Sequence, residues 1–312
     1  MPPALGAVFN VRDAAGAGVS HDRLRARDLV RPFHGVRATS PPVGTEAVCR
    51  AYGARMRDGD VFSHVTAATL WRMPLPMLLG PTLVHVTSPV GVRAARGRGV
   101  RGHTHPLVPE DVRVVGGLRV TSPEVTWTHL STILPWWDLA AVGDFIVTGL
   151  PFESVLPLAS RDDLVRAHER AASSAGAVAR RRALEHIVVG PLSRPESLSL
   201  VLFRLAGLPD PAINEPVDDA RGSFVALPDA SWRDFRVAYE YEGDHHRRVD
   251  TYRRDVRRAE RLADEGWVVV RATADDLYGR PAELVGRVAR RLRARGWLGH
   301  PRRLPRIGPI ER

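Results

Sequence analysis

The sequence contains no lysine, a single cysteine and no long apolar run. The lone Cys49 excludes an internal disulfide framework and is typical of a protein kept in a reducing compartment. No stretch of about 18 apolar residues occurs, which argues against a transmembrane helix and a membrane partner. The N-terminal stretch MPPALGAVFN has no basic segment followed by a long apolar one. We therefore expect no secretory signal and a cytoplasmic location.

The absence of lysine makes arginine the source of all the basic charge. The 45 basic residues outweigh 35 acidic ones, which gives a net charge of +10 and an isoelectric point of about 10.9. Such a charge favours a polyanionic partner, and DNA is the one expected here. However, arginine together with abundant Ala, Gly, Pro and Val is typical of a GC-rich genome. The charge alone is explained equally well by a solvated basic surface.

The length of 312 residues predicts two or three domains, and the alternation of helical and strand patterns predicts an α/β (α+β) fold. The expected divisions are a winged helix-turn-helix in 1–58, a mixed α/β middle domain in 59–158, connecting helices in 159–189, a second compact α/β domain in 190–298, and a basic, Pro-rich tail in 299–312.

Residues 8–39 predict two short helices followed by a strand or wing. A glycine turn at 16–18 separates the helices, and Ser20 is placed to cap the second one. Leu24 and Leu29 would face the core, and Arg31-Pro32 would end the helix. A helix, tight turn, capped basic helix and wing form the winged helix-turn-helix pattern.

The DNA contacts predicted for this region lie on the second helix and the wing. They are Ser20, His21, Arg23, Arg27 and Arg37. The alternative is a small helical hairpin whose arginines are only solvated.

The middle segment predicts a helix over 63–71 capped by Ser63, strands over 82–89 and 117–123, and a Gly/Arg-rich turn over 92–105. His103 and His105 form an H-x-H pair, with His85 upstream. Because no carboxylate or cysteine stands near them in the sequence, we expect solvent-facing or core histidines and no zinc site.

The C-terminal domain reads as helix, strand, strand, strand, helix, strand, helix. Residues 224–232 and 235–242 predict a hairpin, and 267–273 predict a central strand covered on both faces. A turn at Arg233-Asp234 would place Asp229 opposite Ala238 and make Glu240 its diagonal neighbour on the same face.

Carboxylates that converge in this way need a positive charge between them. Mg²⁺ binds one or two carboxylates together with water and phosphate oxygens, and it can activate water for phosphodiester hydrolysis. Glu196, on the preceding helix, could supply a third ligand. The sequence therefore predicts a Mg²⁺ (or Mn²⁺) site at Asp229, Glu240 and Glu196.

Each of these residues also has a structural explanation. Ser193 and Glu196 fit a capping box, in which Glu196 returns to the Ser193 amide. Asp229 could be a solvated strand end, and His245 and His246 could be solvated helix caps. Glu240 interrupts an apolar strand and is the hardest to explain without a site.

The stretches RPES, LPDASW and EYEGDHH, in this order and continuing through residues 250–273, resemble the PD-(D/E)xK restriction-endonuclease-like superfamily, and within it the very-short-patch-repair-like branch. The resemblance covers about 190–297 and implies a metal-dependent endodeoxyribonuclease. It implies catalytic roles for Glu196, Asp229, Glu240, Glu242 and His246. Glu242 stands where the family has a lysine, and arginine cannot replace that lysine as a base. Water activation would then depend on the metal, alone or with His245 or His246.

The N-terminal half has a resemblance of its own. GVSHDRLRARDLVRPFHGVR and FSHVTAATLWRMPLP are similar to the abortive-infection-type antitoxins over about residues 5–150. That resemblance implies a winged helix that represses its own operon and a protein that counteracts a nucleotidyltransferase toxin. It supplies no catalytic residue.

Two functions follow from these patterns. The first is a DNA-binding protein with a metal-dependent endonuclease-like domain, serving defence, repair or mobile-element control. The second is a catalytically inactive transcriptional regulator or antitoxin. RNA remains open as a substrate, and a homodimer would suit both winged-helix binding and double-strand cleavage.

Overall fold

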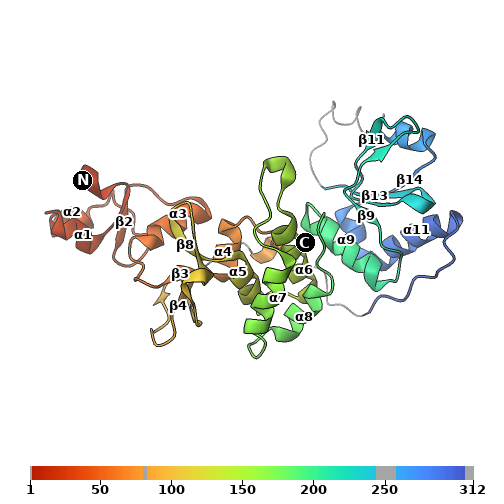
Figure 1. Ribbon diagram of the computed structural model, residues 1–312. Coiled ribbons are helices and arrows are strands. Elements are labelled where there is room, and N and C mark those ends of the chain that lie inside the picture. Colours follow the sequence, from red (N-terminus) through yellow and green to blue (C-terminus); the bar gives the residue numbers. More distant parts are fainter. Residues whose placement is uncertain (1, 80–82, 244–257, 306–312) are drawn as a thin grey trace. The chain divides into compact units, whose positions relative to one another are not determined.

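The computed structural model describes residues 2–79, 83–243 and 258–305, and it confirms a mixed α/β fold. The chain forms two compact units (Figure 1). The first comprises Met1–Leu75, Leu79–Pro135 and Arg161–Arg181, and the second comprises Pro76–Leu78, Trp136–Ser160 and Arg182–Arg312. In the part of the chain that is described, every helix is too short or too polar to cross a lipid bilayer.

The first unit begins with a small helical and stranded region. Its elements are η1 (Pro3–Leu5), β1 (Val8–Asn10), α1 (Val11–Gly16), α2 (His21–Arg25) and β2 (Val36–Ala38). Strands β1 and β2 pair antiparallel, and Phe9, Ala14, Leu24 and Leu29 form a local core. The predicted core positions of Leu24 and Leu29 are confirmed.

The predicted cap of the second helix is also confirmed, because Ser20 Oγ accepts a hydrogen bond of 3.3 Å from the Arg23 amide. The helix is shorter than expected and ends at Arg25. Ala26 is already extended, and Arg37 Nε donates to the Leu24 carbonyl at 2.7 Å, which satisfies an acceptor at the helix end. Val8–Asn10, which had been expected to begin a helix, pairs as a strand instead.

The rest of the first unit is built on a six-stranded sheet with the order β5-β6-β4-β3-β8-β7. Its strands are β3 (Val61–Phe62), β4 (Val84–Ser88), β5 (Arg96–Gly97), β6 (Val100–Thr104), β7 (Val112–Val115) and β8 (Leu118–Thr121). The helical elements are α3 (Gly44–Gly53), α4 (His64–Leu70), η3 (Pro109–Asp111), α5 (Pro123–Leu130) and α7 (Arg161–Arg170). The elements η2 (Met77–Leu79) and α8 (Ala177–Leu184) include residues of both units.

The helix predicted over 63–71 is confirmed as α4, but the Gly/Arg-rich stretch 92–105 is not the open turn that was expected. It forms β5 and β6, and β6 runs parallel to β4. Gly102 permits the pairing of β6 with β5, since a Cβ at this position would lie 2.0 Å from the carbonyl oxygen of Ala95, which precedes β5. The prediction was wrong because Gly and Arg are poor strand markers, whereas here glycine allows the close approach of a neighbouring strand.

The second unit contains a four-stranded sheet with the order β14-β13-β12-β9 and a separate β10-β11 ribbon. Its strands are β9 (Ala212–Ile213), β10 (Val217–Asp218), β11 (Phe224–Ala226), β12 (Ala230–Trp232), β13 (Val237–Tyr241) and β14 (Val268–Ala272). Its helical elements are α6 (Trp136–Thr148), η4 (Pro151–Glu153), α9 (Arg194–Leu205), η5 (Arg233–Phe235), η6 (Asp275–Gly279) and α11 (Pro281–Ala294). Residues 136–158, assigned by the sequence to the middle domain, thus belong to this unit.

Helices α9 and α11 pack on one face of this sheet (Figure 1). On that face the Tyr239 ring lies edge-on to Phe203 of α9, and its hydroxyl is 2.7 Å from Ser199 Oγ. The other face carries Ala238 and Glu240, because side chains alternate along β13.

Two strand predictions for this unit were wrong. The expected strand 224–232 divides into β11 and β12, with Pro228 between them, since proline lacks the N–H that a continuous ladder needs. The stretch 267–273 gives β14, which ends the order of the described strands instead of lying at its centre. Strand β13 is buried from Val237 to Glu240, whereas β14 carries the exposed Arg271.

Candidate functional site

The ends of β12 and β13 bring two carboxylates together. Ala230 pairs with Tyr239 and Trp232 pairs with Val237. Continuing this register by one residue places Asp229 level with Glu240. The expected pairing of Asp229 with Ala238 is therefore wrong, because Ala238 pairs with Ser231. The connection uses residues 233–236 instead of the two that a tight turn would use, so the two acidic residues stand level with each other on neighbouring strands.

Asp229 is held by the backbone of the neighbouring strand. Its Oδ2 accepts a hydrogen bond of 2.6 Å from the amide of Tyr241. Burial, followed by the negative charges of Glu196 and Glu240, raises the pKa of Asp229 to about 7 against the opposing effect of the Tyr241 amide and Arg258. A buried acid flanked by like charges is a mark of functional sites.

Glu240 is buried, and arginines face it from two sides. Its Oε2 lies 3.3 Å from Arg258 Nη2 and 3.8 Å from Arg271 Nε. Arg271 stands beside Glu240 in the parallel register of β13 and β14, and its Nε is also 3.4 Å from Glu242 Oε1. The position that carries the lysine in the resembling family is thus an acid paired with an arginine. Arginine neutralises charge here but cannot accept a proton.

Glu196 forms the capping box that the sequence offered as its structural explanation. Its Oε1 accepts from Ser193 Oγ at 2.7 Å, and its Oε2 accepts from the Leu192 amide at 2.9 Å and from Asn214 Nδ2 at 3.0 Å. The amide that it reaches is Leu192, not Ser193 as expected. With both oxygens held by donors, Glu196 contributes negative charge near Asp229 but is not positioned as a free metal ligand.

The carboxylates present fit a divalent cation in number and kind. Mg²⁺ takes one or two protein carboxylates and completes its shell with water or phosphate oxygens. Asp229 and Glu240 supply such a pair, whereas Glu196 does not fit as the third ligand. The predicted residues His245 and His246 lie outside the described residues.

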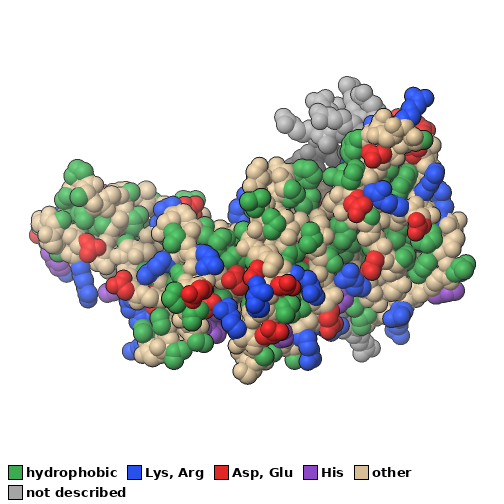
Figure 2. Space-filling view, in the orientation of Figure 1, with side chains coloured by type: hydrophobic (Ala, Val, Ile, Leu, Met, Phe, Trp, Pro, Cys, Tyr) green, Lys and Arg blue, Asp and Glu red, His purple; other side chains and the backbone are tan. Residues whose placement is uncertain are grey.

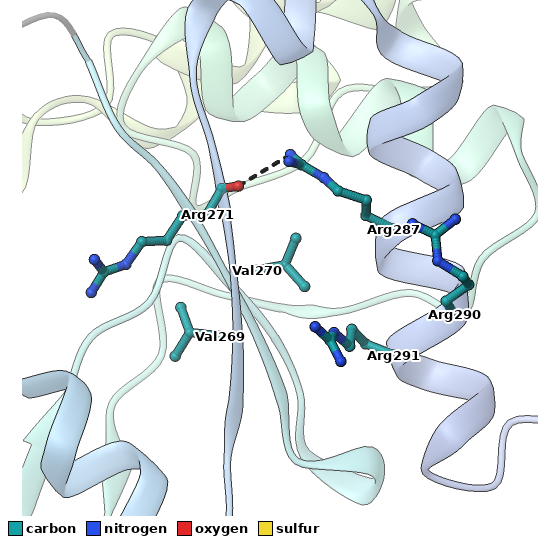
Figure 3. A pocket seen from close by; sticks show the side chains of 6 residues that line it. All are labelled: Val269, Val270, Arg271, Arg287, Arg290 and Arg291. Carbon is teal, nitrogen blue, oxygen red and sulfur yellow. Dashed lines mark hydrogen bonds between the residues drawn. The ribbon is translucent and has the colours of Figure 1, made fainter.

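An arginine-lined pocket of about 380 Å³ lies between β14 and α11 (Figure 3). Arg287 lines it and donates to the Arg271 carbonyl at 3.1 Å, while the exposed Arg290 and Arg291 stand on the next turn of the helix. The Arg271 side chain points away from α11, toward the face of the carboxylates (Figure 3). Sequence reasoning did not identify the arginines of α11 that line this pocket, Arg287, Arg290 and Arg291. Their spacing of three and four residues places them on one helix face.

The predicted DNA contacts of the first unit divide into two sets. Arg23 pairs with Asp28 through both terminal nitrogens at 2.8 and 2.9 Å, and Arg37 bonds backbone carbonyls, so both stabilise the local fold. Ser20 caps α2. His21 and Arg27 are exposed on this surface.

The histidines of the first unit take the core alternative of the expectation, not the solvent-facing one. His85 is buried, and His103 and His105 are half-buried, so none of them faces solvent freely. His64 and His129 join them in one stacked cluster. The predicted capping of α4 by Ser63 is wrong, because Ser63 Oγ contacts His64 Nδ1 at 2.9 Å and makes no helix-capping bond.

No family model matches this chain. The chain is 27% identical over 267 residues to uncharacterized protein MT2308 of Mycobacterium tuberculosis strain CDC 1551 / Oshkosh and to uncharacterized protein Rv2248 of strain ATCC 25618 / H37Rv. Each alignment covers 85% of this chain and 92% of the relative. A crystal structure of the RV2827C protein from Mycobacterium tuberculosis is 20% identical, covers 60% of this chain and 80% of that one, and gives a TM-score of 0.37. A TM-score this low does not establish a shared fold.

Proposed function

We propose that this chain is a cytoplasmic DNA-binding protein whose second unit is a metal-dependent endonuclease-like domain. The observation that carries the proposal is the pairing of Asp229 with Glu240 at a buried strand end. There, burial and like charges raise the pKa of Asp229 to about 7. A divalent cation between the two carboxylates would relieve this repulsion. Bound Mg²⁺ or Mn²⁺ would supply charge neutralisation at a phosphate and a more acidic water.

The chain's own residues would take distinct roles in this proposal. Asp229 and Glu240 would hold the cation, and the Tyr241 amide fixes the orientation of Asp229. Arg271 balances Glu240 and Glu242. Across β14, Arg290 and Arg291 would contact the phosphate backbone of DNA, which attracts arginine regardless of sequence.

The second candidate is a catalytically inactive regulator or antitoxin that binds DNA through the first unit. The surroundings of Glu240 favour this second candidate, because Arg258 and Arg271 already neutralise the charge of its carboxylate without a metal. The acid at position 242 also favours this second candidate, because the resembling family commonly has a lysine there, although some relatives of the branch carry an acid. In this proposal His21 and Arg27 would contact DNA, and a nucleotidyltransferase toxin and a second copy of the chain would be the partners.

Calorimetric titration with Mn²⁺ tests the proposed metal site at Asp229 and Glu240. We expect wild type to bind Mn²⁺ and Asp229→Asn/Glu240→Gln to lose that binding event, because the variant removes both ligand charges. Asp234→Asn is the matched control, since Asp234 is an exposed acid of the same hairpin. If the double variant gives the same isotherm as wild type, Asp229 and Glu240 do not bind the metal.

Cleavage of supercoiled plasmid in Mg²⁺ or Mn²⁺ then separates the two candidates. Nicking or linearisation by wild type, lost in the double variant and kept in Asp234→Asn, would support the endonuclease. Intact plasmid with DNA binding that survives Asp229→Asn/Glu240→Gln would support the regulator.

A further inference from the structure

A cluster of histidines in the first unit has no part in the proposed nuclease. It contains His64 at the start of α4, His85 on β4, His103 and His105 at the end of β6, and His129 on α5. The ring centroids are 3.7 Å apart for His64 and His103, 4.5 Å for His64 and His129, and 4.4 Å for His105 and His129. The rings form a continuous stack drawn from separate elements.

The fold brings these rings together through strand pairing and helix packing. In the parallel pair of β4 and β6, His103 stands beside Thr87, and His85 lies two residues earlier on β4. Helices α4 and α5 pack against each other and bring His64 close to His129. His64 has a φ of 51°, which non-glycine residues seldom adopt and which concentrates at functional sites.

Three of the histidines have the spacing of a metal site. Ligand nitrogens of His64, His103 and His105 all lie within 4.8 Å of one another. Zinc binds histidine nitrogen at about 2.0–2.1 Å, which puts tetrahedral ligands roughly 3.4 Å apart. Small side-chain rotations would therefore close the site.

Neighbouring polar groups orient two of these rings. His64 Nδ1 is 2.9 Å from Ser63 Oγ, and Ser63 Oγ accepts a hydrogen bond of 2.8 Å from Thr87 Oγ1. This arrangement points His64 Nε2 away from Ser63. His103 Nε2 is 3.1 Å from His85 Nδ1. Partners on the second ring nitrogen are the usual means by which proteins fix metal-ligating histidines.

His129 gives an independent indication of a ligand. It is 6% exposed, stacks on His64 and His105, and its Nδ1 has no hydrogen-bond partner among the described residues. A buried polar atom without a partner costs about 1–3 kcal/mol. A water bound to the metal would satisfy this nitrogen.

The cluster opens into a pocket of about 660 Å³. Its lining includes His64, His105 and His129, and also Asp111 and Arg170, which pair at 3.1 Å. Zinc sites that keep an open coordination position typically use three protein ligands and face such a cavity, whereas structural sites are closed by a fourth ligand.

The donor set selects the metal. Imidazole favours zinc and other late transition metals, whereas Mg²⁺ prefers oxygen.

We propose that His64, His103 and His105 bind one Zn²⁺ ion, with an open coordination position toward the pocket that takes water or an anionic oxygen ligand. The site is independent of the carboxylates of the second unit. It assigns the first unit a metal-binding role in addition to any contact with DNA.

Zinc titration of the full chain, purified without a histidine tag and stripped with a chelator, tests the proposal. We expect one Zn²⁺ per chain, and replacement by Co²⁺ should give the intense visible bands of tetrahedral coordination. His103→Ala and His105→Ala should each weaken binding about 100-fold or more. His34→Ala, which changes an exposed histidine of the same unit, should leave binding unchanged.

The controls keep the test decisive. Circular dichroism identifies any variant that has not folded, and the half-buried His105 is the position at which alanine should be tolerated best. Asp229→Asn/Glu240→Gln should bind zinc as wild type does, which separates this site from the nuclease proposal. Absence of stoichiometric zinc binding by wild type, or an unchanged affinity in folded His103→Ala and His105→Ala, would overturn the proposal.

Discussion

At the scale of single residues, Asp144 of α6 is a fully buried acid outside the proposed sites. It is 1% exposed, and its Oδ1 accepts a hydrogen bond of 2.7 Å from the Val188 amide. Burial raises the pKa of Asp144 to about 7 despite this bond and one from Ser197. The folded state therefore holds the proton of Asp144 more tightly than the unfolded state does.

This difference predicts a pH-dependent stability. Because the pKa is higher in the folded state, the free energy of unfolding should fall as pH rises through the interval from about 4 to about 7. From pH 5 to pH 8 the titration of Asp144 should lower the free energy of unfolding by roughly 2–3 kcal/mol. In urea titrations at the two pH values, Asp144→Asn should be stabilised relative to wild type by more at pH 8 than at pH 5. An equal difference at both values would contradict this expectation.

At the scale of elements, helices α6 and α9 are joined by a buried ion pair. Arg194, in the first turn of α9, places Nη2 2.7 Å from Asp138 Oδ1 in the first turn of α6, and the side chains are 7% and 3% exposed. Arg194 Nη1 also donates to Tyr278 Oη at 3.3 Å. The pair fixes the N-terminal end of α9, from which Glu196 projects.

Removing one charge of the Arg194–Asp138 pair should lower the free energy of unfolding strongly, whereas replacing both residues should lower it much less. Arg194→Met leaves a buried carboxylate without its cation, and we expect a loss of about 3–5 kcal/mol in the free energy of unfolding. Arg194→Met/Asp138→Leu removes both charges and should recover most of that loss. Chemical denaturation of wild type, both single variants and the double variant measures the coupling. Additive losses in the double variant would show that the pair does not act as a unit.

At the scale of the whole molecule, a net charge of +10 does not by itself locate a nucleic-acid surface. Arginine and acidic side chains are interspersed on the face shown in Figure 2. The local arrangement is more informative: Arg23 and Arg37 serve the fold of the first unit, whereas Arg290 and Arg291 are exposed beside the pocket of the second unit.

The salt dependence of DNA binding distinguishes the two units. Each phosphate neutralised by an arginine contributes a slope of about 0.9 to the fall of log K with log salt. Arg290→Gln/Arg291→Gln should therefore reduce the slope by about 2 in fluorescence anisotropy titrations of one duplex. His21→Gln/Arg27→Gln provides the matched comparison in the first unit. If only that variant changes the slope, DNA binds the first unit and the arginine pocket has another role.

The sequence by itself determined the features that depend on nearby residues. Ser20 caps α2, Leu24 and Leu29 enter a core, and 63–71 contains a helix, because caps and hydrophobic periodicity act over a single turn. The alternation along 237–241 likewise predicted the strand that carries Glu240. The capping box of Glu196 was also readable, because Ser193 stands three residues before it.

The tertiary structure alone decided what depends on distant segments. The length of the 233–236 connection set Asp229 level with Glu240, and parallel pairing with β13 put Arg271 where it neutralises both Glu240 and Glu242. His64, His103 and His129 come from elements far apart in the chain, and no local pattern encodes their contact. Local propensity acts over a few residues, whereas the convergence of side chains at a site follows from strand order, register and helix packing, which only the folded chain fixes.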